Sequence, residues 1–307
     1  MIQEKISVGA GSQFPLKGIL TLPGGEGQPF PAVVFVHGSG SSNMDEKVGR
    51  LTPFKDLAEG LARRGIASVR YDKRSFAHPL KLLRLKELTV YQETIEDAIL
   101  AAELLRKDPR IDPERIFIIG HSMGGMLAPR IDAEGGNFRG LIIMAGTPRK
   151  LEEILAEQSE AALSLMKGLL RPIAEKQIKK TLSLFDGLYS LSDEEAKAKK
   201  AGGGTTLYYF KEMGQRPVEN YLKKSQKPML IMQGGKDFQV SVERDFNLYK
   251  SLLAGRGDVS FRLYEELNHA FVPSVYGSIL KAKQEYAKEQ HIGNRVIDDI
   301  AHWILAN

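Results

Sequence analysis

The sequence predicts an α/β fold whose mainly parallel sheet is flanked by helices. Short runs of apolar and β-branched residues alternate with longer segments whose apolar residues recur at helical spacing, as in repeated strand–helix–strand units. The run AVVFVHGSG at residues 32–40 begins with five consecutive apolar residues, which is typical of a strand buried on both faces of a parallel sheet. The alternation stops near residue 148 and resumes at residue 228, so the middle of the chain is predicted to be an insertion.

The predicted strands begin with a hairpin, in which the turn GSQFP separates two runs rich in apolar and β-branched residues. A loop rich in glycine and proline then leads into the strands of the sheet. In chain order, strands are predicted at residues 5–10, 16–23, 32–40, 66–74, 116–120, 140–146, 228–237 and 259–269.

Helices are predicted where apolar residues recur every three or four positions. The first, at residues 52–65, has Thr52 as its N-cap, Pro53 at its first helical position and Gly65 at its end. These residue types favour these places in a helix. Further helices are predicted at residues 90–107, directly after Ser122, at residues 241–255 and at residues 294–305.

The chain is predicted to form an α/β core in two parts, with a helical lid inserted between them. Residues 1–147 and 228–307 form the core, and residues 148–227 form the lid. The length of 307 residues, with 42% hydrophobic and 26% charged residues, suits a globular core of this size. The chain has no cysteine, which excludes disulfides, thiolate metal ligands and cysteine nucleophiles and fits a reducing cytoplasm.

Charge and hydropathy argue against several other classes of protein. The formal net charge of +5 is mild and no nucleic-acid-binding motif accompanies it, so no nucleic-acid partner is expected. No stretch approaches the roughly 20 apolar residues of a membrane-spanning helix, and the first residues lack the pattern of a signal peptide. We therefore expect a cytoplasmic protein that acts on a small molecule. A homodimer is compatible with the sequence.

A serine between glycines follows one of the predicted strands. In GHSMGG, Gly120 and Gly124 lie two positions before and after Ser122, which matches the pattern G-x-S-x-G of a nucleophile elbow. A strand that turns sharply into a helix leaves the serine at the apex, where side chains at the two glycine positions would collide. The alternative is a turn of small residues that packs strand on helix. The apolar strand before the motif and the helix after it favour the nucleophile.

A serine nucleophile needs a base, and the base needs a carboxylate that orients it. Of the six histidines, His269 in LNHAF stands just after the last predicted strand, where a loop could reach across the sheet edge to Ser122. Asp237 in GGKD follows a strand at its carboxyl end, where sites gather in open parallel sheets, and completes the order Ser, Asp, His. Glu243 and Asp245 are less suited because they fall within the next predicted helix. The alternatives are a surface or core histidine and a loop or cap aspartate.

The tetrahedral intermediate of acyl transfer needs hydrogen-bond donors for its oxyanion. One donor is expected to be the backbone N–H of Met123, the residue after the nucleophile. The second is expected from the HGSG loop after the third predicted strand, with the N–H of Ser39 preferred and Gly40 as its neighbour. His37 and Gly38 in the same loop are expected to have structural roles.

Five motifs occur in the order in which they are found in the α/β-hydrolase family, which this chain resembles over almost its whole length. They are HGSG, RYDKR, GHSMGG, GGKD and NHAF. Within the family the chain is most similar to bacterial esterases of the dienelactone-hydrolase-like and serine-aminopeptidase-like, lysophospholipase-type group. The resemblance implies an eight-stranded sheet, a lid after the sixth strand, and carboxylic ester hydrolysis without a metal or other cofactor.

The segment RYDKR is similar to a family segment in which Asp72 and Arg74 brace the oxyanion loop. Relatives usually continue this segment with glycine, whereas here Ser75 follows. The turn at this position, and the pocket wall beside it, are therefore expected to depart from the family pattern.

The lid is expected to decide which substrate is accepted. Its apolar helix positions either pack the lid on the core or line an apolar acyl pocket, to which Tyr208, Tyr209 and Phe210 would contribute. We expect a small to medium acyl or aryl ester, with peptidase, amidase or thioesterase activity, or a non-catalytic binding module, as alternatives. The apolar positions are Leu163, Leu165, Met166, Leu169, Leu170, Leu182, Leu184, Phe185, Leu188 and Tyr189.

Overall fold

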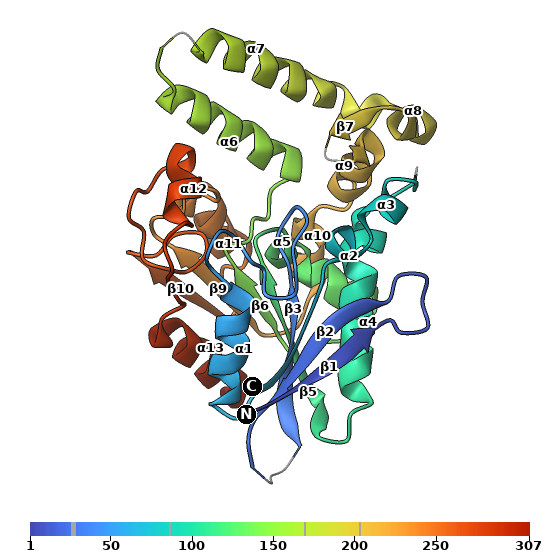
Figure 1. The fold of residues 1–307 in the computed structure, drawn as a ribbon, viewed down its shortest axis with the longest axis vertical. Coiled ribbons are helices and arrows are strands. Elements are labelled where there is room, and N and C mark those ends of the chain that lie inside the picture. The colour runs from blue at the N-terminus through green and yellow to red at the C-terminus, as the bar shows by residue number, and fades with distance from the viewer. Residues whose placement is uncertain (26–28, 86, 169, 203) are drawn as a thin grey trace.

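The computed structural model describes residues 1–25, 29–85, 87–168, 170–202 and 204–307, and within these ranges it contains an eight-stranded sheet (Figure 1). The strand order is β1-β2-β4-β3-β5-β6-β9-β10. The first two strands join antiparallel, as do β2 and β4, and the other neighbours are parallel. The predicted eight-stranded, mostly parallel sheet is therefore confirmed. The strands are β1 Ile2–Val8, β2 Leu16–Leu22, β3 Phe30–Val36, β4 Ala67–Tyr71, β5 Ile111–His121, β6 Leu141–Met144, β9 Met229–Gly234 and β10 Val259–Tyr264.

Strand β3, at the centre of the sheet, is apolar throughout because both faces of the sheet are covered. Successive side chains of a strand point to opposite faces. In β3, Val34 and Val36 therefore belong to one hydrophobic cluster, and Val33 and Phe35 belong to another. The first cluster includes side chains of α4 Glu96–Arg106 and α5 Met123–Ile131. The second includes side chains of α1 Pro53–Ala62 and α13 Asn294–Ala306, which lie side by side in Figure 1.

Some element boundaries differ from those predicted. Strand β5 begins at Ile111 rather than at residue 116, because Ile111 pairs with Phe30 before a β-bulge restores the register. The predicted helix at residues 90–107 starts as a π-helical turn, Tyr91–Ile95. The predicted helix at residues 241–255 likewise starts as a π-helical turn, Val242–Phe246, and continues as α11 Asn247–Leu252.

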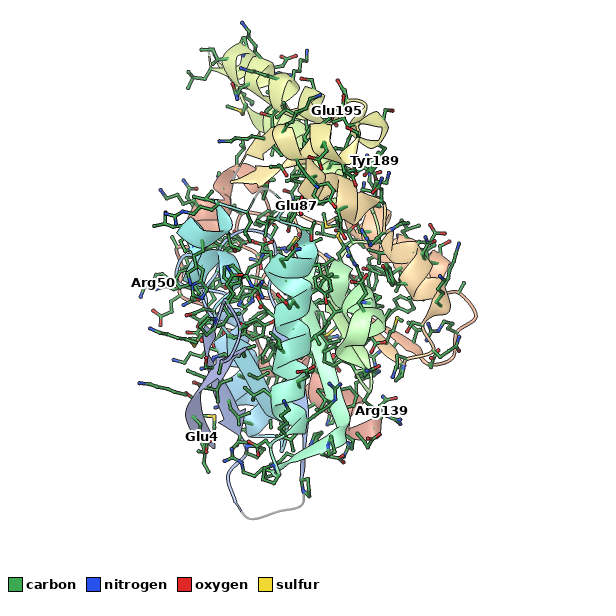
Figure 2. All side chains as sticks on the ribbon, turned by 90° about the vertical axis from the view of Figure 1, so that its right-hand side faces the viewer. Glu4, Arg50, Glu87, Arg139, Tyr189 and Glu195 are labelled. Atoms are coloured by element: carbon green, nitrogen blue, oxygen red, sulfur yellow. The ribbon has the colours of Figure 1, made fainter. Side chains whose placement is uncertain are left out.

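The segment between β6 and β9 projects from one end of the core (Figure 1), and Figure 2 shows Tyr189 and Glu195 within it. A short hairpin, β7 Lys200–Gly202 and β8 Thr205–Thr206, occurs where no strand is predicted. Strands of two or three residues are too short to leave a periodic pattern in the sequence. The helices are α6 Leu151–Leu165, α7 Arg171–Leu182, α8 Asp193–Ala198, α9 Leu207–Gly214 and α10 Val218–Lys224, with 3₁₀ turns at Ser183–Phe185 and Leu188–Ser190. Two short helices of the core, α2 Arg74–Ala77 and α3 Pro79–Leu82, lie below this segment.

The apolar lid positions, expected either to pack on the core or to line a pocket, divide between buried and exposed residues. Leu188 is buried and Phe185 packs against Phe210, with ring centroids 4.9 Å apart. Leu165 and Leu170 are instead 49% and 68% exposed, because the end of α6 and the start of α7 extend beyond the core. Leu169 lies outside the described residues. Within the described ranges, no helix has the length and apolar content that crossing a membrane requires.

Candidate active site

Ser122 occupies a sharp turn between β5 and α5. Strand β5 ends at His121, and α5 begins at Met123. The backbone of Ser122 has φ 54° and ψ −117°, a region that residues other than glycine rarely adopt and that concentrates at functional sites. Its N–H donates to the carbonyl oxygen of Met144 at 2.9 Å, so the turn is anchored to β6.

The turn packs backbone against backbone at the predicted glycine positions. A Cβ atom on Gly120 would lie 2.2 Å from the carbonyl oxygen of Gly124. A Cβ atom on Gly124 would lie 2.2 Å from the carbonyl oxygen of Val36 in β3. Both distances are far below van der Waals contact. Glycine at these two positions is what allows α5 to start directly beside β3 and β5.

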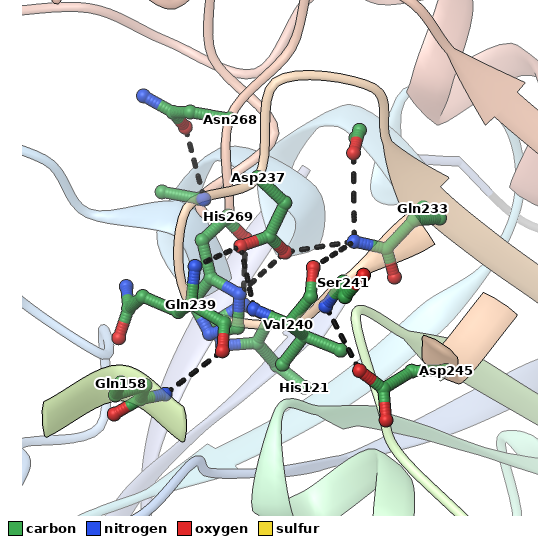
Figure 3. Close-up of polar contacts among 12 residues, drawn as sticks. His121, Gln158, Gln233, Asp237, Gln239, Val240, Ser241, Asp245, Asn268 and His269 are labelled. Carbon is green, nitrogen blue, oxygen red and sulfur yellow. Dashed lines mark hydrogen bonds and ion pairs between the residues drawn. The ribbon is translucent and has the colours of Figure 1, made fainter. Parts of the chain in front are cut away.

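Asp237 and His269, predicted from different loops, are in direct contact (Figure 3). The Nδ1 atom of His269 lies 2.7 Å from Oδ2 of Asp237. Where the carboxylate accepts this hydrogen bond, Nδ1 carries a proton, and in the neutral imidazole the lone pair is then on Nε2. The Asp237 carboxylate also accepts from the N–H groups of Gln239 and Val240, at 2.7 and 3.0 Å, and from the Gln233 amide at 2.8 Å. These bonds hold the buried carboxylate in one orientation.

The loop after β10 places the His269 imidazole beside the residue that precedes Ser122. The rings of His121 and His269 have centroids 4.7 Å apart, and Nε2 of His121 donates to the His269 carbonyl oxygen at 2.9 Å. In the part of the chain that the structure describes, Ser122 makes no hydrogen bond to His269. Such a bond is often long until a substrate tightens it.

The HGSG loop lies against the serine. A Cβ atom on Gly38 would be 3.1 Å from Cβ of Ser122. Ser39 and Met123, the two predicted oxyanion donors, line the same cavity. Within the described ranges, the backbone N–H of neither residue has a hydrogen-bond partner, so both are free to donate. Gly40 has φ 85°, a left-handed conformation that glycine adopts at little cost.

Two histidines hold the loops of the site, and a structural role was expected for His37. His37 is buried and its Nε2 donates to the carbonyl oxygen of Asn43 at 3.0 Å. Burial lowers the pKa of His37 to about 4, so the ring is neutral near pH 7. His121 lies with its Nδ1 3.0 Å from Oε2 of Glu46, an ion pair. Oε1 of Glu46 accepts from the Gly38 N–H at 2.8 Å.

The expectation that Arg74 braces the oxyanion loop is wrong. Asp72 does contact the segment after β3, since its Oδ1 accepts from the Met44 N–H at 2.9 Å. The Arg74 guanidinium turns the other way and pairs with Asp97 of α4. Lys73, between them, contacts the HGSG loop instead, and it is not among the residues predicted from the sequence. Ser75, where an unusual turn was expected, lies within α2.

Lys73 is held close to the HGSG loop by Glu93, which is not among the residues predicted from the sequence, and Glu93 in turn contacts Tyr209, which was expected only as a pocket residue. Its Nζ donates to the Gly38 carbonyl oxygen at 2.9 Å and lies 3.4 Å from Oε1 of Glu93. Oε2 of Glu93 accepts from the Tyr209 hydroxyl at 2.7 Å. No local signal links these residues, because they come from separate elements and meet only in the folded chain.

A cavity of about 570 Å³ adjoins the loop and the elbow. Its wall is mostly apolar, and it includes Tyr209 and Phe210 but not Tyr208, which lies under the Lys197 ammonium. Within the described ranges, no group of three or more His, Asp or Glu residues is arranged to hold a metal ion. The core contributes Ser39, Gly40, Ser41, Ser75, Pro79, Leu82, Leu83, Leu88, Glu93 and Met123 to the wall, and the lid contributes Leu151, Leu155, Ala201, Gly202, Gly204, Thr205, Tyr209 and Phe210.

Known proteins resemble this chain in sequence and in fold. The sequence pattern of the family described as "Serine aminopeptidase, S33" matches residues 27–273. Esterase EstD of Thermotoga maritima is 37% identical over 290 residues, which are 94% of this chain and 65% of EstD. A structure of Est1E from Butyrivibrio proteoclasticus with ferulic acid bound has a TM-score of 0.62 at 14% identity, over 98% of this chain and 100% of that one. The Pyrococcus furiosus esterase Pf2001 has a TM-score of 0.61 at 14% identity, over 99% and 91%.

The elbow geometry predicts that Gly124→Ala will destabilise the fold. The added Cβ would meet backbone rather than a flexible side chain, so we expect the free energy of unfolding in urea to fall by about 1–3 kcal/mol. Gly257→Ala is the matched control, because a Cβ there meets nothing within 4 Å. Equal effects of the two substitutions would contradict the backbone packing.

The pair of Glu46 and His121 predicts a pH-dependent contribution to stability. Burial raises the pKa of Glu46, but His121 outweighs it and the net shift is downward. Burial lowers the pKa of His121, but Glu46 outweighs it and the net shift is upward. The pair therefore stabilises most between the ordinary pKa values of the two groups, about pH 4.3–6.5. Its contribution is lost as pH falls through the lowered pKa of Glu46 or rises through the raised pKa of His121.

We expect Glu46→Gln to lower the free energy of unfolding by roughly 3 kcal/mol near pH 5.5 and by less at pH 9. Urea denaturation across this pH range measures the difference. Glu103→Gln, at an exposed position, should show no such trend. A constant difference between wild type and Glu46→Gln at all pH values would contradict the ion pair.

Proposed function

This chain belongs to the serine aminopeptidase S33 family, and on that premise we propose that it is a serine hydrolase that cleaves small to medium acyl or aryl carboxylic esters. The observation that carries the proposal is the hydrogen bond between Asp237 and His269, formed beside the Ser122 elbow. The similarity to esterase EstD supports the same reaction.

In the proposed mechanism, Nε2 of His269 takes the hydroxyl proton of Ser122 as its Oγ attacks the ester carbonyl carbon. Asp237 holds the imidazole in the required tautomer and stabilises the imidazolium. The N–H groups of Ser39 and Met123 bind the oxyanion of the tetrahedral intermediate. His269 then protonates the leaving alcohol, and water hydrolyses the acyl-enzyme by the same steps.

The cavity beside the elbow supports the substrate class. Its volume of about 570 Å³ and its leucine-rich wall suit an apolar acyl or aryl group. Ferulic acid, bound in the Est1E structure, carries an aryl group that such a wall suits, so a hydroxycinnamoyl ester is one candidate. An apolar pocket discriminates by only about 1–3 kcal/mol per methylene, so we expect broad specificity.

Peptidase or amidase activity is the second candidate, because the family's description names an aminopeptidase. An aminopeptidase needs a carboxylate that is free to bind the substrate's amine. Among the described residues of the cavity wall, Glu93 is the acidic one, and Lys73 and Tyr209 already engage it. This observation favours ester hydrolysis over aminopeptidase activity. Thioesters remain as further substrates, because they too have no amine that needs a free carboxylate.

A panel of p-nitrophenyl esters, from acetate to laurate and with a feruloyl ester, tests the proposal beside aminoacyl-nitroanilides. We expect wild type to hydrolyse the esters faster than the anilides. Ser122→Ala should lower kcat by at least about a thousandfold, since the nucleophile is removed. If Ser122→Ala kept wild-type rates, the nucleophile assignment would be wrong. Faster hydrolysis of the anilides than of the esters would support the peptidase hypothesis instead.

The position of the cavity predicts that Leu155→Trp, on α6, will shorten the accepted acyl chain. The larger side chain would fill space beside Leu151 in the wall, so kcat/KM for laurate should fall at least about tenfold more than for acetate. Leu163→Trp on the same helix is the control, because Leu163 does not line the cavity. An unchanged chain-length profile would show that the acyl group binds elsewhere.

A further inference from the structure

We propose that Lys73 is a positioning residue of the oxyanion hole, which orients the Ser39 N–H by holding the carbonyl oxygen of the same peptide group. The inference rests on the proposed function, because it takes the Ser39 N–H as an oxyanion donor. It assigns a role in catalysis to a buried lysine that touches neither the nucleophile nor its base.

The sheet topology brings the three loops concerned together. Strands β4, β3 and β5 are neighbours, so the residues that follow their carboxyl ends share one edge of the sheet. Lys73 follows β4, the HGSG loop follows β3, and Ser122 follows β5. Lys73 is 2% exposed, and its own N–H donates to the Ser42 carbonyl oxygen at 3.0 Å. Both ends of the lysine are thus tied to the oxyanion loop.

Because of peptide geometry, the contact of Lys73 with the Gly38 carbonyl oxygen fixes the direction of the Ser39 N–H. In a trans peptide the carbonyl oxygen and the next residue's N–H point in opposite directions, and no described residue has a cis peptide bond. The Lys73 ammonium holds the Gly38 carbonyl oxygen at 2.9 Å. The Ser39 N–H must therefore point away from Lys73. Glu46 holds the N–H of Gly38 at 2.8 Å, so the peptide groups on both sides of the Gly38 Cα are fixed.

Glu93 keeps the ammonium in place. Its Oε1 lies 3.4 Å from Nζ of Lys73, and its Oε2 accepts from the Tyr209 hydroxyl. Burial raises the pKa of Glu93, but the Lys73 charge and the hydrogen bonds outweigh it, so the net shift is downward and the carboxylate is ionised. The same Tyr209 hydroxyl lies 3.8 Å from the sulfur of Met123. The network therefore contacts Gly38, whose carbonyl oxygen shares a peptide group with the Ser39 N–H, and the side chain of Met123.

A cation on the carbonyl oxygen also strengthens the donor. A hydrogen bond from a charged group is stronger than one from a neutral group, and it polarises the peptide to which it is made. The polarised N–H gains most when a full negative charge faces it, which happens in the transition state and not in the bound ester. Loss of Lys73 should therefore lower kcat and leave KM nearly unchanged.

The test compares Lys73→Met with a matched control, Lys211→Met. Lys211 is also buried, and its Nζ also donates to a backbone carbonyl oxygen, that of Leu191 at 2.7 Å, and pairs with a carboxylate, that of Asp193 at 2.6 Å. Its partners lie in the lid segment, away from the oxyanion loop. A general effect of removing a buried lysine would appear in both variants.

Kinetics on p-nitrophenyl butyrate and the Ki values of two inhibitors distinguish a misoriented oxyanion donor from a general loss of folded protein. We expect Lys73→Met to lower kcat by about 10- to 100-fold, less than the roughly 10²–10³ lost with an entire donor, with KM within about twofold. The Ki of an aryl trifluoromethyl ketone, which adds to the serine and forms an oxyanion, should rise about tenfold. The Ki of the matching methyl ketone should not change, and Lys211→Met should change neither Ki.

Lys73→Met leaves Glu93 buried without its cation, which can itself unfold a protein. The double variant Lys73→Met/Glu93→Gln removes that charge and should show the same loss of kcat and of trifluoromethyl ketone affinity. Failure of the double variant to fold, while Lys211→Met folds, would overturn the inference by making the role of Lys73 structural.

The outcomes also distinguish this inference from the proposed function. Suppose that wild type hydrolyses esters and that Ser122→Ala does not. If Lys73→Met then leaves the Ki of the trifluoromethyl ketone unchanged relative to that of the methyl ketone, the role of Lys73 alone is overturned. A wild type without ester hydrolysis, or an active Ser122→Ala, would overturn the proposed function and the inference with it.

Discussion

The close packing of backbone at the Ser122 turn is the constraint on which the rest of the site depends. The chain passes from β5 to α5 at a distance from β3 that leaves no room for a Cβ at Gly120 or Gly124. Because of that closeness, the first N–H of α5 and the loop after β3 lie on the same cavity. A wider turn would separate the serine from the loop, whatever residues the loop contained.

Buried charges around the turn are arranged in pairs that orient backbone groups. Glu46 pairs with His121 and holds the Gly38 N–H, while Lys73 pairs with Glu93 and holds the Gly38 carbonyl oxygen. Burying ions is costly unless each is paired and hydrogen-bonded. The presence of these pairs does not show that the fold is more stable than it would be with apolar residues in their place, although removing one partner leaves the other charge unpaired. Their common feature is that each holds one polar group of the loop that faces the serine.

The inserted segment adds a wall to the site and keeps much of its own apolar surface exposed. Leu151, Leu155 and Phe210 line the cavity, whereas Leu165 and Leu170 face solvent. The part of the insertion nearest the core thus shapes the cavity. Tyr209 joins this wall to Glu93, so the apolar pocket and the polar network meet at one side chain of the insertion.

The sequence by itself determined the order of the eight sheet strands and of the longer core helices, the elbow motif, and the candidates Asp237 and His269, because strand burial and turn chemistry leave local patterns. The hydrogen bond between Asp237 and His269, and the pairing of Glu46 with His121, were decided by tertiary structure. So was the contact of Lys73, rather than Arg74, with the oxyanion loop. A charged residue chooses its partner by proximity in space, and that proximity arises only when β4, β3 and β5 align as neighbours. Short strands such as β7 and β8, and the exposure of the lid leucines, likewise follow from where the insertion lies on the core.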